Sequence, residues 1–145
     1  MKQSYKTRQA RTSRLLSPYT TQEEFSVKTD AVDLQAKLAS FEGHWQPRTV
    51  SEFNGHDVMV VKVQGDYSWH SHPESDDFFL VLKGELHIDI EGSPTVILRP
   101  GQLYVVPRGV RHRPRAAQEA QLLLIEPTGA PNSGDAATAA PRRVI

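Results

Sequence analysis

The apolar and polar positions between Thr49 and Glu126 alternate with a period of two, which is the pattern of strands that bury one face. Turn-forming residues interrupt this alternation at intervals of roughly eight to twelve positions. Asn54-Gly55 is a strong hairpin signal among them. Short strands separated by regular turns predict an all-β sandwich or barrel. The expected strands are Thr49–Phe53, Asp57–Val63, Tyr67–His72, Asp77–Leu82, Glu85–Ile90, Thr95–Leu98, Leu103–Val106 and Ala120–Glu126.

A short helix is predicted just before these strands, from Asp30 to Phe41. Leu34, Leu38 and Phe41 follow one another at spacings of four and three, so they form one apolar stripe on a helix. Asp30 or Asp33 is the expected N-terminal cap. The pattern therefore changes from a helical period to a strand period where the barrel begins.

One predicted strand is apolar on both of its faces. Along Asp77–Leu82, Phe78 and Leu80 point to one side of the sheet, and Phe79 and Val81 point to the other. A barrel wall buries only one face in its own interior. The second face therefore needs a cover, either the N-terminal arm or a second subunit.

A chain of 145 residues is expected to form one domain. Residues 30–128 are predicted to form the barrel with its leading helix. Residues 129–145, rich in Gly, Ala and Pro, are predicted to be a surface strap or a disordered tail. Residues 1–29 are predicted to be a basic, irregular arm, because Met1 to Gln22 hold five basic residues and no acidic one. An organelle transit peptide is the alternative for this arm.

Composition excludes several kinds of partner and site. Lys+Arg and Asp+Glu are 17 each, so no net field attracts nucleic acid or an anionic membrane. No apolar run approaches the roughly 20 residues that a membrane-spanning helix requires. The absence of cysteine excludes disulfides and thiolate metal ligands, and it is compatible with a cytoplasmic location.

Four residues are spaced as metal ligands. His70 and His72 are two positions apart on a strand, so both imidazoles project from the same face, roughly 7 Å apart. Asp77 starts the returning strand, which brings its carboxylate back beside them. His112 follows the tight turn Pro107-Arg108-Gly109 and can supply a third imidazole. Three imidazoles and a carboxylate suit one divalent ion of iron, manganese, nickel, copper, cobalt or zinc.

With the glycines and the proline around these residues included, the chain resembles the cupin superfamily over about residues 41 to 128. The first cupin motif runs from Gly through His-x-His and an acidic residue to Gly. The second runs from Gly through Pro-x-Gly to His. The matching residues here are Gly65, His70, His72, Asp77 and Gly84 in the first motif, and Gly101, Pro107, Gly109 and His112 in the second.

The chain departs from this family pattern at two positions. Gly65 is one residue closer to His70 than usual. The acidic ligand, normally Glu, is Asp77, whose side chain is one methylene shorter. Asp77 can therefore coordinate the ion directly, reach it through water, or leave a site of three histidines. Its neighbour Asp76 is expected to point away from the site.

The resemblance implies a cupin-type jelly-roll barrel, or double-stranded β-helix, that assembles as a homodimer and binds a small molecule. Metal-dependent oxygenase, isomerase and lyase activities on small polar molecules all occur among cupins. A non-catalytic module that binds or senses a small ligand is the alternative. A structural barrel that has lost its metal is a third hypothesis, suggested by Asp77.

The remaining candidate residues have simpler interpretations. His87 lies on a polar strand face with Asp89 and is expected to face solvent. A basic cluster near the barrel rim is expected to be a solvated surface, although one of its arginines could bind an acidic substrate. This cluster consists of Arg108, Arg111, Arg113 and Arg115.

Overall fold

The computed structural model describes Val27 and residues 29–145. Every element below belongs to the compact unit of residues 31–145. The basic arm predicted for residues 1–29 lies outside the described residues, apart from its positions 27 and 29. Within the described part of the chain, no helix has the length and apolar character that crossing a membrane requires.

A short helix precedes the strands in this unit. The helix begins after Asp33, whose carboxylate accepts a hydrogen bond from the Ala36 amide at 3.1 Å, as an N-cap does. The predicted span Asp30–Phe41 is therefore too long at its start, and it is also too long at its end, because the helix stops at Ala39. The elements are α1 (Leu34–Ala39), β1 (Arg48–Phe53), β2 (His56–Asp66), β3 (Asp77–Lys83), β4 (Leu86–Ile90), β5 (Ser93–Leu98), β6 (Leu103–Val106) and β7 (His112–Pro127).

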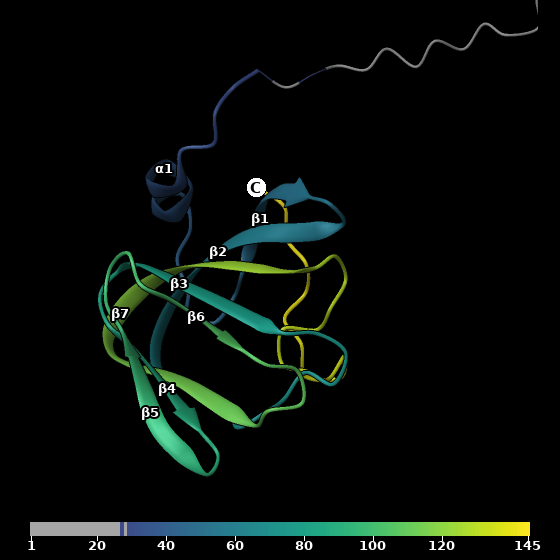
Figure 1. Cartoon of the computed structure of the whole chain (residues 1–145). Helices are drawn as coiled ribbons and strands as arrows, with labels where there is room; N and C mark the ends of the chain where they lie inside the picture. The colour runs from purple at the N-terminus through teal and green to yellow at the C-terminus, as the bar shows by residue number, and fades with distance from the viewer. Residues whose placement is uncertain (1–26, 28) are drawn as a thin grey trace, which may run out of the picture. The chain divides into compact units, whose positions relative to one another are not determined.

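The long strand β7 organises the sheet. It pairs antiparallel with β2 and β3, and its first residues pair with β4. The strand order is β1-β2-β7-β3-β6, with β5 attached through β4. This one strand of 16 residues pairs with β2 and β3 and also with the β4–β5 hairpin. The sheet therefore curls around a common interior (Figure 1). The predicted all-β barrel with a short leading helix is confirmed.

Strand β7 starts earlier than the sequence predicts. The last strand was expected to begin at Ala120, but β7 begins at His112. Residues 112–115 pair with β4 in a regular antiparallel register. The neighbouring strand β4 thus holds this polar, proline-containing segment extended, although its own sequence is a poor strand former.

Two further strand boundaries differ from the prediction. Tyr67–His72 is not a strand, because only His70 forms a bridge, an isolated one with His112. In addition, the strand predicted as Asp57–Val63 continues beyond Val63 to Asp66 in β2, with a shift of register between Val63 and Gly65. The positive φ of 80° at Gly65 allows the strand to change register there.

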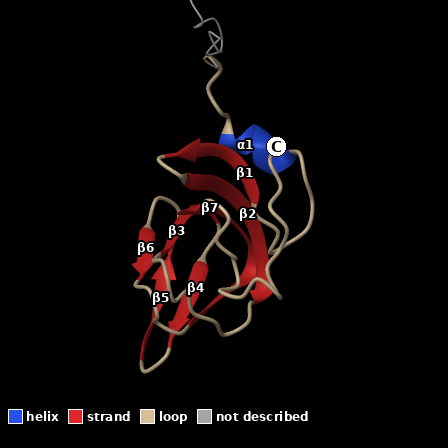
Figure 2. Cartoon of the chain, turned by 90° about the vertical axis from the view of Figure 1, so that its right-hand side faces the viewer, coloured by secondary structure: helices blue, strands red, loops and turns tan. Residues whose placement is uncertain are grey.

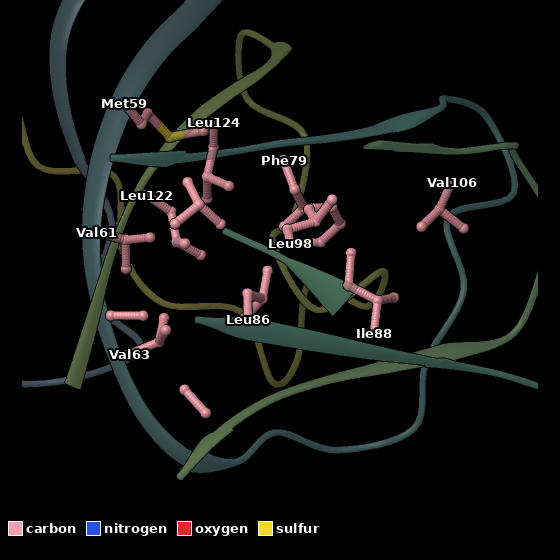
Figure 3. Packing of buried hydrophobic residues seen from close by; sticks show 13 residues of the cluster. Met59, Val61, Val63, Phe79, Leu86, Ile88, Leu98, Val106, Leu122 and Leu124 are labelled. Atoms are coloured by element: carbon pink, nitrogen blue, oxygen red, sulfur yellow. The ribbon is translucent and has the colours of Figure 1, made fainter. Parts of the chain in front are cut away.

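Apolar side chains from most strands fill the barrel interior (Figure 3). On β3, the inward-facing Phe79 and Val81 are 5% and 0% exposed, while Phe78 and Leu80 on the outer face are half-buried. The predicted alternation along this strand is therefore confirmed. The buried interior cluster is Met59, Val61, Val63, Phe79, Val81, Leu86, Ile88, Leu98, Val106, Ala116, Ala120, Leu122 and Leu124.

Helix α1 covers part of the outer face of the barrel. Its Leu38 packs with Val50 and Val60, and Leu82 and Leu123 lie at the edge of the same cluster. Figure 2 shows α1 beside β1 and β2. Part of the cover that the two-sided strand requires thus comes from the same chain.

Residues 128–145, called here the C-terminal strap, return along the sheet edge at β1 (yellow in Figure 1). The Thr49 amide donates to the Arg143 carbonyl at 2.7 Å, and the Ile145 amide donates to the Thr49 carbonyl at 3.0 Å. The Arg142 guanidinium donates to the Asp57 carboxylate at 2.7 Å. Backbone and charge contacts thus hold the end of the strap against β1 and β2.

Candidate metal centre

His70 and His112 face each other across an isolated antiparallel bridge. The His70 amide donates to the His112 carbonyl at 3.0 Å, and the reverse bond measures 2.9 Å. Their ring centroids are 4.4 Å apart. The Gly109 amide donates to the His72 carbonyl at 2.8 Å, so the turn before β7 is tied to the other histidine as well. Main-chain pairing therefore joins the two sequence motifs.

Asp77, the first residue of β3, directs its carboxylate at these imidazoles. Its Oδ2 lies 2.9 Å from Nε2 of His112, 3.3 Å from Nε2 of His72 and 4.0 Å from Nε2 of His70. One ligand atom from each of the four residues lies within 4.8 Å of all the others. The structure thus brings the four predicted residues together. This group, the His–Asp cluster, consists of His70, His72, Asp77 and His112.

Backbone contacts determine which ring nitrogen carries a hydrogen. Nδ1 of His70 is 2.9 Å from the Ser68 carbonyl oxygen, and Nδ1 of His112 is 2.9 Å from the Val110 carbonyl oxygen. A carbonyl oxygen only accepts, so Nδ1 is the donor in both rings. In the neutral imidazoles, Nε2 then holds a lone pair directed toward the Asp77 carboxylate.

These acceptor atoms require a positive charge among them. Nε2 of a neutral His112 and the ionised Oδ2 of Asp77 repel each other at 2.9 Å unless a proton or a cation lies between them. Nε2 of His72 is buried and, although Oδ2 of Asp77 lies 3.3 Å away, it forms no hydrogen bond with the described residues, which is costly for a polar atom. One proton satisfies one such contact, whereas one divalent ion satisfies all of them. The residues present therefore fit a metal ion.

Burial and charge act in opposite directions on this cluster. Burial lowers the pKa of His70. Burial also lowers the pKa of His72, but the Asp77 carboxylate outweighs it, so the net direction is upward. Burial raises the pKa of Asp77, but the contacts with His112 and His72 bring it below its usual value. In the metal-free protein, protons therefore compete with a metal for the same atoms.

Glu126 is a buried carboxyl group that the sequence analysis missed. It is 5% exposed and lies near the end of β7. Burial, followed by the negative charge of Asp77, raises the pKa of Glu126 to about 7. Its place in the inward series Leu122, Leu124, Glu126 was the available signal, because an acid in that phase of a buried strand points into the barrel.

A small cavity of about 40 Å³ adjoins the His–Asp cluster. His70, Asp77 and Glu126 supply polar groups to its wall. Most of the remaining wall is apolar, and Trp45 and Phe79 are its largest apolar side chains. The cluster therefore faces a confined and largely apolar space.

The basic cluster and His87 lie apart from this centre. Arg113 and Arg115 both donate to the Asp89 carboxylate, at 2.8 Å and 2.9 Å, so these two arginines are occupied by an ion pair. His87 contacts the Glu85 carboxylate at 2.7 Å and is half-buried rather than fully solvated. Asp76, expected to point away, is exposed and accepts the Arg108 amide at 2.9 Å.

The fold and the His–Asp cluster define a small β-barrel with a candidate metal centre inside it. The family model for the cupin domain matches residues 57–126. A stretch of 78 residues is 38% identical to the uncharacterized protein YdbB of Bacillus subtilis, covering 54% of this chain and 69% of that protein. The chain belongs to the cupin superfamily.

Two other relatives are informative. A solved cupin-2 domain protein from Shewanella frigidimarina is 36% identical, with a TM-score of 0.64, and covers 66% of this chain and 93% of that one. A 3-hydroxyanthranilate 3,4-dioxygenase of Brucella anthropi is 32% identical over 84 residues, which is 52% of this chain and 46% of the dioxygenase. The chain thus spans less than half of that enzyme.

Proposed function

We propose that this protein holds one divalent transition-metal ion in the His–Asp cluster. The observation that carries the proposal is the convergence of buried imidazole lone pairs on one carboxylate, with Nε2 of His72 unpartnered in the described residues. This donor set is compatible by ligand type with iron, manganese, nickel, copper, cobalt and zinc. The metal is therefore to be identified by elemental analysis rather than by geometry.

We further propose that the metal-loaded protein is an enzyme acting on a small molecule, with oxygenase chemistry favoured over isomerase or lyase chemistry. A bound ion supplies Lewis acidity and an open coordination position. The confined apolar cavity next to the cluster has room for a molecule as small as dioxygen. The similarity to a dioxygenase over part of its length supports the same choice.

Glu126 is the residue placed to move a proton in such a reaction. It lines the cavity together with His70 and Asp77. Its pKa of about 7 in the metal-free protein is raised first by burial. A nearby divalent cation favours the ionised carboxylate and lowers that pKa. In the metal-loaded protein, Glu126 is therefore expected to accept a proton from a bound molecule rather than donate one.

An oxygen electrode tests the enzyme proposal. Protein loaded with Fe²⁺ is expected to consume oxygen when mixed with one class in a panel of phenols, thiols and amino acids. Zn²⁺-loaded protein is the matched control, because zinc has no redox chemistry. Tight binding of one class without oxygen uptake or product formation would support the alternative, a non-catalytic binding or sensing module.

A homodimer is proposed because part of the outer face remains uncovered by the described residues. Leu103 and Val105 on β6 are 56% and 38% exposed, beside half-buried Phe78 on β3. Light scattering at micromolar concentration is expected to give twice the mass of one chain. Leu103→Asp should shift the protein toward monomer, whereas Ile97→Asp, at an exposed position on β5, should not. A monomeric wild type would contradict the proposal.

A further inference from the structure

The cavity beside the His–Asp cluster is too small for an organic substrate. Its volume is about 40 Å³. That space holds on the order of three water molecules, whereas pockets for small-molecule ligands usually occupy roughly 300 Å³ or more. A substrate of the proposed enzyme must therefore place most of its atoms elsewhere.

A larger chamber of about 260 Å³ lies between the C-terminal strap and the barrel. It shares Pro47, Glu126 and Asn132 with the smaller cavity, so the two spaces meet at a common wall. The strap supplies mainly small side chains to the chamber, among them Ala136 and Ala139. Because these side chains are short, they leave the space open instead of filling it.

The C-terminal strap contacts the segment that carries His70 and His72 as well as the sheet edge. A side chain at Gly134 would collide with the carbonyl oxygen of Ser71, which lies between two of the candidate ligands in sequence. Asn132 accepts a hydrogen bond from the Ala140 amide at 2.8 Å, and its amide nitrogen lies 3.5 Å from the Tyr67 hydroxyl. The chamber wall is thus ordered by specific contacts.

The polar groups in the chamber restrict the chemistry of its occupant. The buried carboxylate of Asp57 is already engaged, by Arg142 at 2.7 Å and by the Thr128 hydroxyl at 3.2 Å. Most of the other lining residues are alanines, prolines and Met59, so the body of a ligand there would be mainly apolar. At the metal end, a divalent ion with Asp77 as its one carboxylate ligand would have an open coordination position, which an anionic oxygen donor fills most strongly.

We propose that the chamber under the C-terminal strap is the binding site for the organic ligand of the metal centre. The ligand class is a compact organic anion, a carboxylate or phenolate, with an apolar body. The body occupies the chamber, and the anionic oxygen reaches past Glu126 toward the His–Asp cluster. This inference rests on the proposed metal centre, which supplies the positive charge.

The test compares two anions on Zn²⁺-loaded protein by isothermal titration calorimetry. Benzoate has both an apolar body and a carboxylate, whereas acetate has almost no body. Wild type is expected to bind benzoate at least tenfold more tightly than acetate. Ala139→Leu and Ala136→Leu fill the chamber and are expected to lower benzoate affinity at least tenfold, with acetate affinity and zinc content unchanged. Ala137→Leu is the matched control, because Ala137 is an exposed strap residue outside the chamber lining.

The outcomes separate this inference from the metal centre itself. The proposal that the chamber binds the ligand would be overturned by equal benzoate affinity in wild type, Ala136→Leu and Ala139→Leu, or by no preference for benzoate over acetate. Either result would leave the proposed metal site intact. Zinc titration of wild type without either anion tests the metal centre alone, and its failure would overturn both proposals. Melting temperatures show whether each variant is folded, and the exposed position of Ala136 makes that variant the more tolerant of the two.

Discussion

Protein with His112 replaced by alanine should lose most of its bound metal on purification. His112 is 1% exposed, and its Nε2 is the imidazole nitrogen closest to Asp77 among the three, at 2.9 Å. Removing this ring takes one of four donors and leaves a cavity beside the carboxylate. An incomplete site binds its ion weakly, and the free energy that metal binding adds to folding is lost with it.

Elemental analysis after dialysis measures the effect. Wild type is expected to hold close to one divalent ion per chain, and His112→Ala a small fraction of that amount. Added metal should raise the melting temperature of wild type but not that of the variant. His87→Ala is the matched control, because His87 is a half-buried histidine whose imidazole contacts Glu85 instead of the cluster. Full metal retention by both His112→Ala and His70→Ala would rule out the assigned centre.

The sequence predicts well those strands whose own residues determine which face is buried or where the neighbouring turn lies. On β3, the alternation of Phe79 and Val81 with Phe78 and Leu80 gave the buried side, because the period of a strand is fixed at two. The hairpin between β1 and β2 was predicted equally well. Asn54-Gly55 adopts φ values of 47° and 73°, which few residues other than asparagine and glycine accept.

The first half of β7 could not be predicted in this way. Residues 113–119 contain a proline and several charged residues. The start of this segment is extended because residues 112–115 pair with β4 and residues 115–116 pair with β2. That pairing brings together positions far apart in the sequence, so no local pattern reveals it. The C-terminal strap is similar, since its composition is typical of disorder. The contacts that order it run to Thr49 and Asp57, far away in the chain.

In the candidate site, too, some residues could be predicted from local sequence and one depends on contacts distant in the sequence. The spacing of His70 and His72 and the turn before His112 predicted three converging imidazoles. The structure brings them together with Asp77, although His70 and His72 do not lie on a strand as that prediction assumed. Glu126 was missed because an acidic residue at the end of an apolar strand resembles an ordinary solvated end. Only the position of β7 relative to β3 makes that carboxyl group part of the same interior space as the cluster.

At Asp77 the chain departs from the usual cupin ligand set. The Asp77→Ala variant should bind metal at least about tenfold more weakly, because loss of even a supporting group of a metal site typically costs that much affinity. The shorter carboxylate still reaches the place where the imidazole nitrogens converge, since its Oδ2 lies within 4.0 Å of all three Nε2 atoms. Its position as the first residue of β3, directly after an irregular segment, allows the backbone to carry it there.

A series of replacements at this position separates the effect of the carboxylate charge from the effect of side-chain length. Asp77→Glu is expected to retain most of the metal affinity, because it restores the acid that cupins commonly use. Asp77→Asn keeps an oxygen at the same distance from the backbone but removes the negative charge, so its affinity should fall between those of the Glu and Ala variants. Competition with a chromogenic chelator at fixed pH measures all three against wild type. Unchanged affinity in Asp77→Ala would show instead that His70, His72 and His112 hold the ion alone, with water in place of the carboxylate.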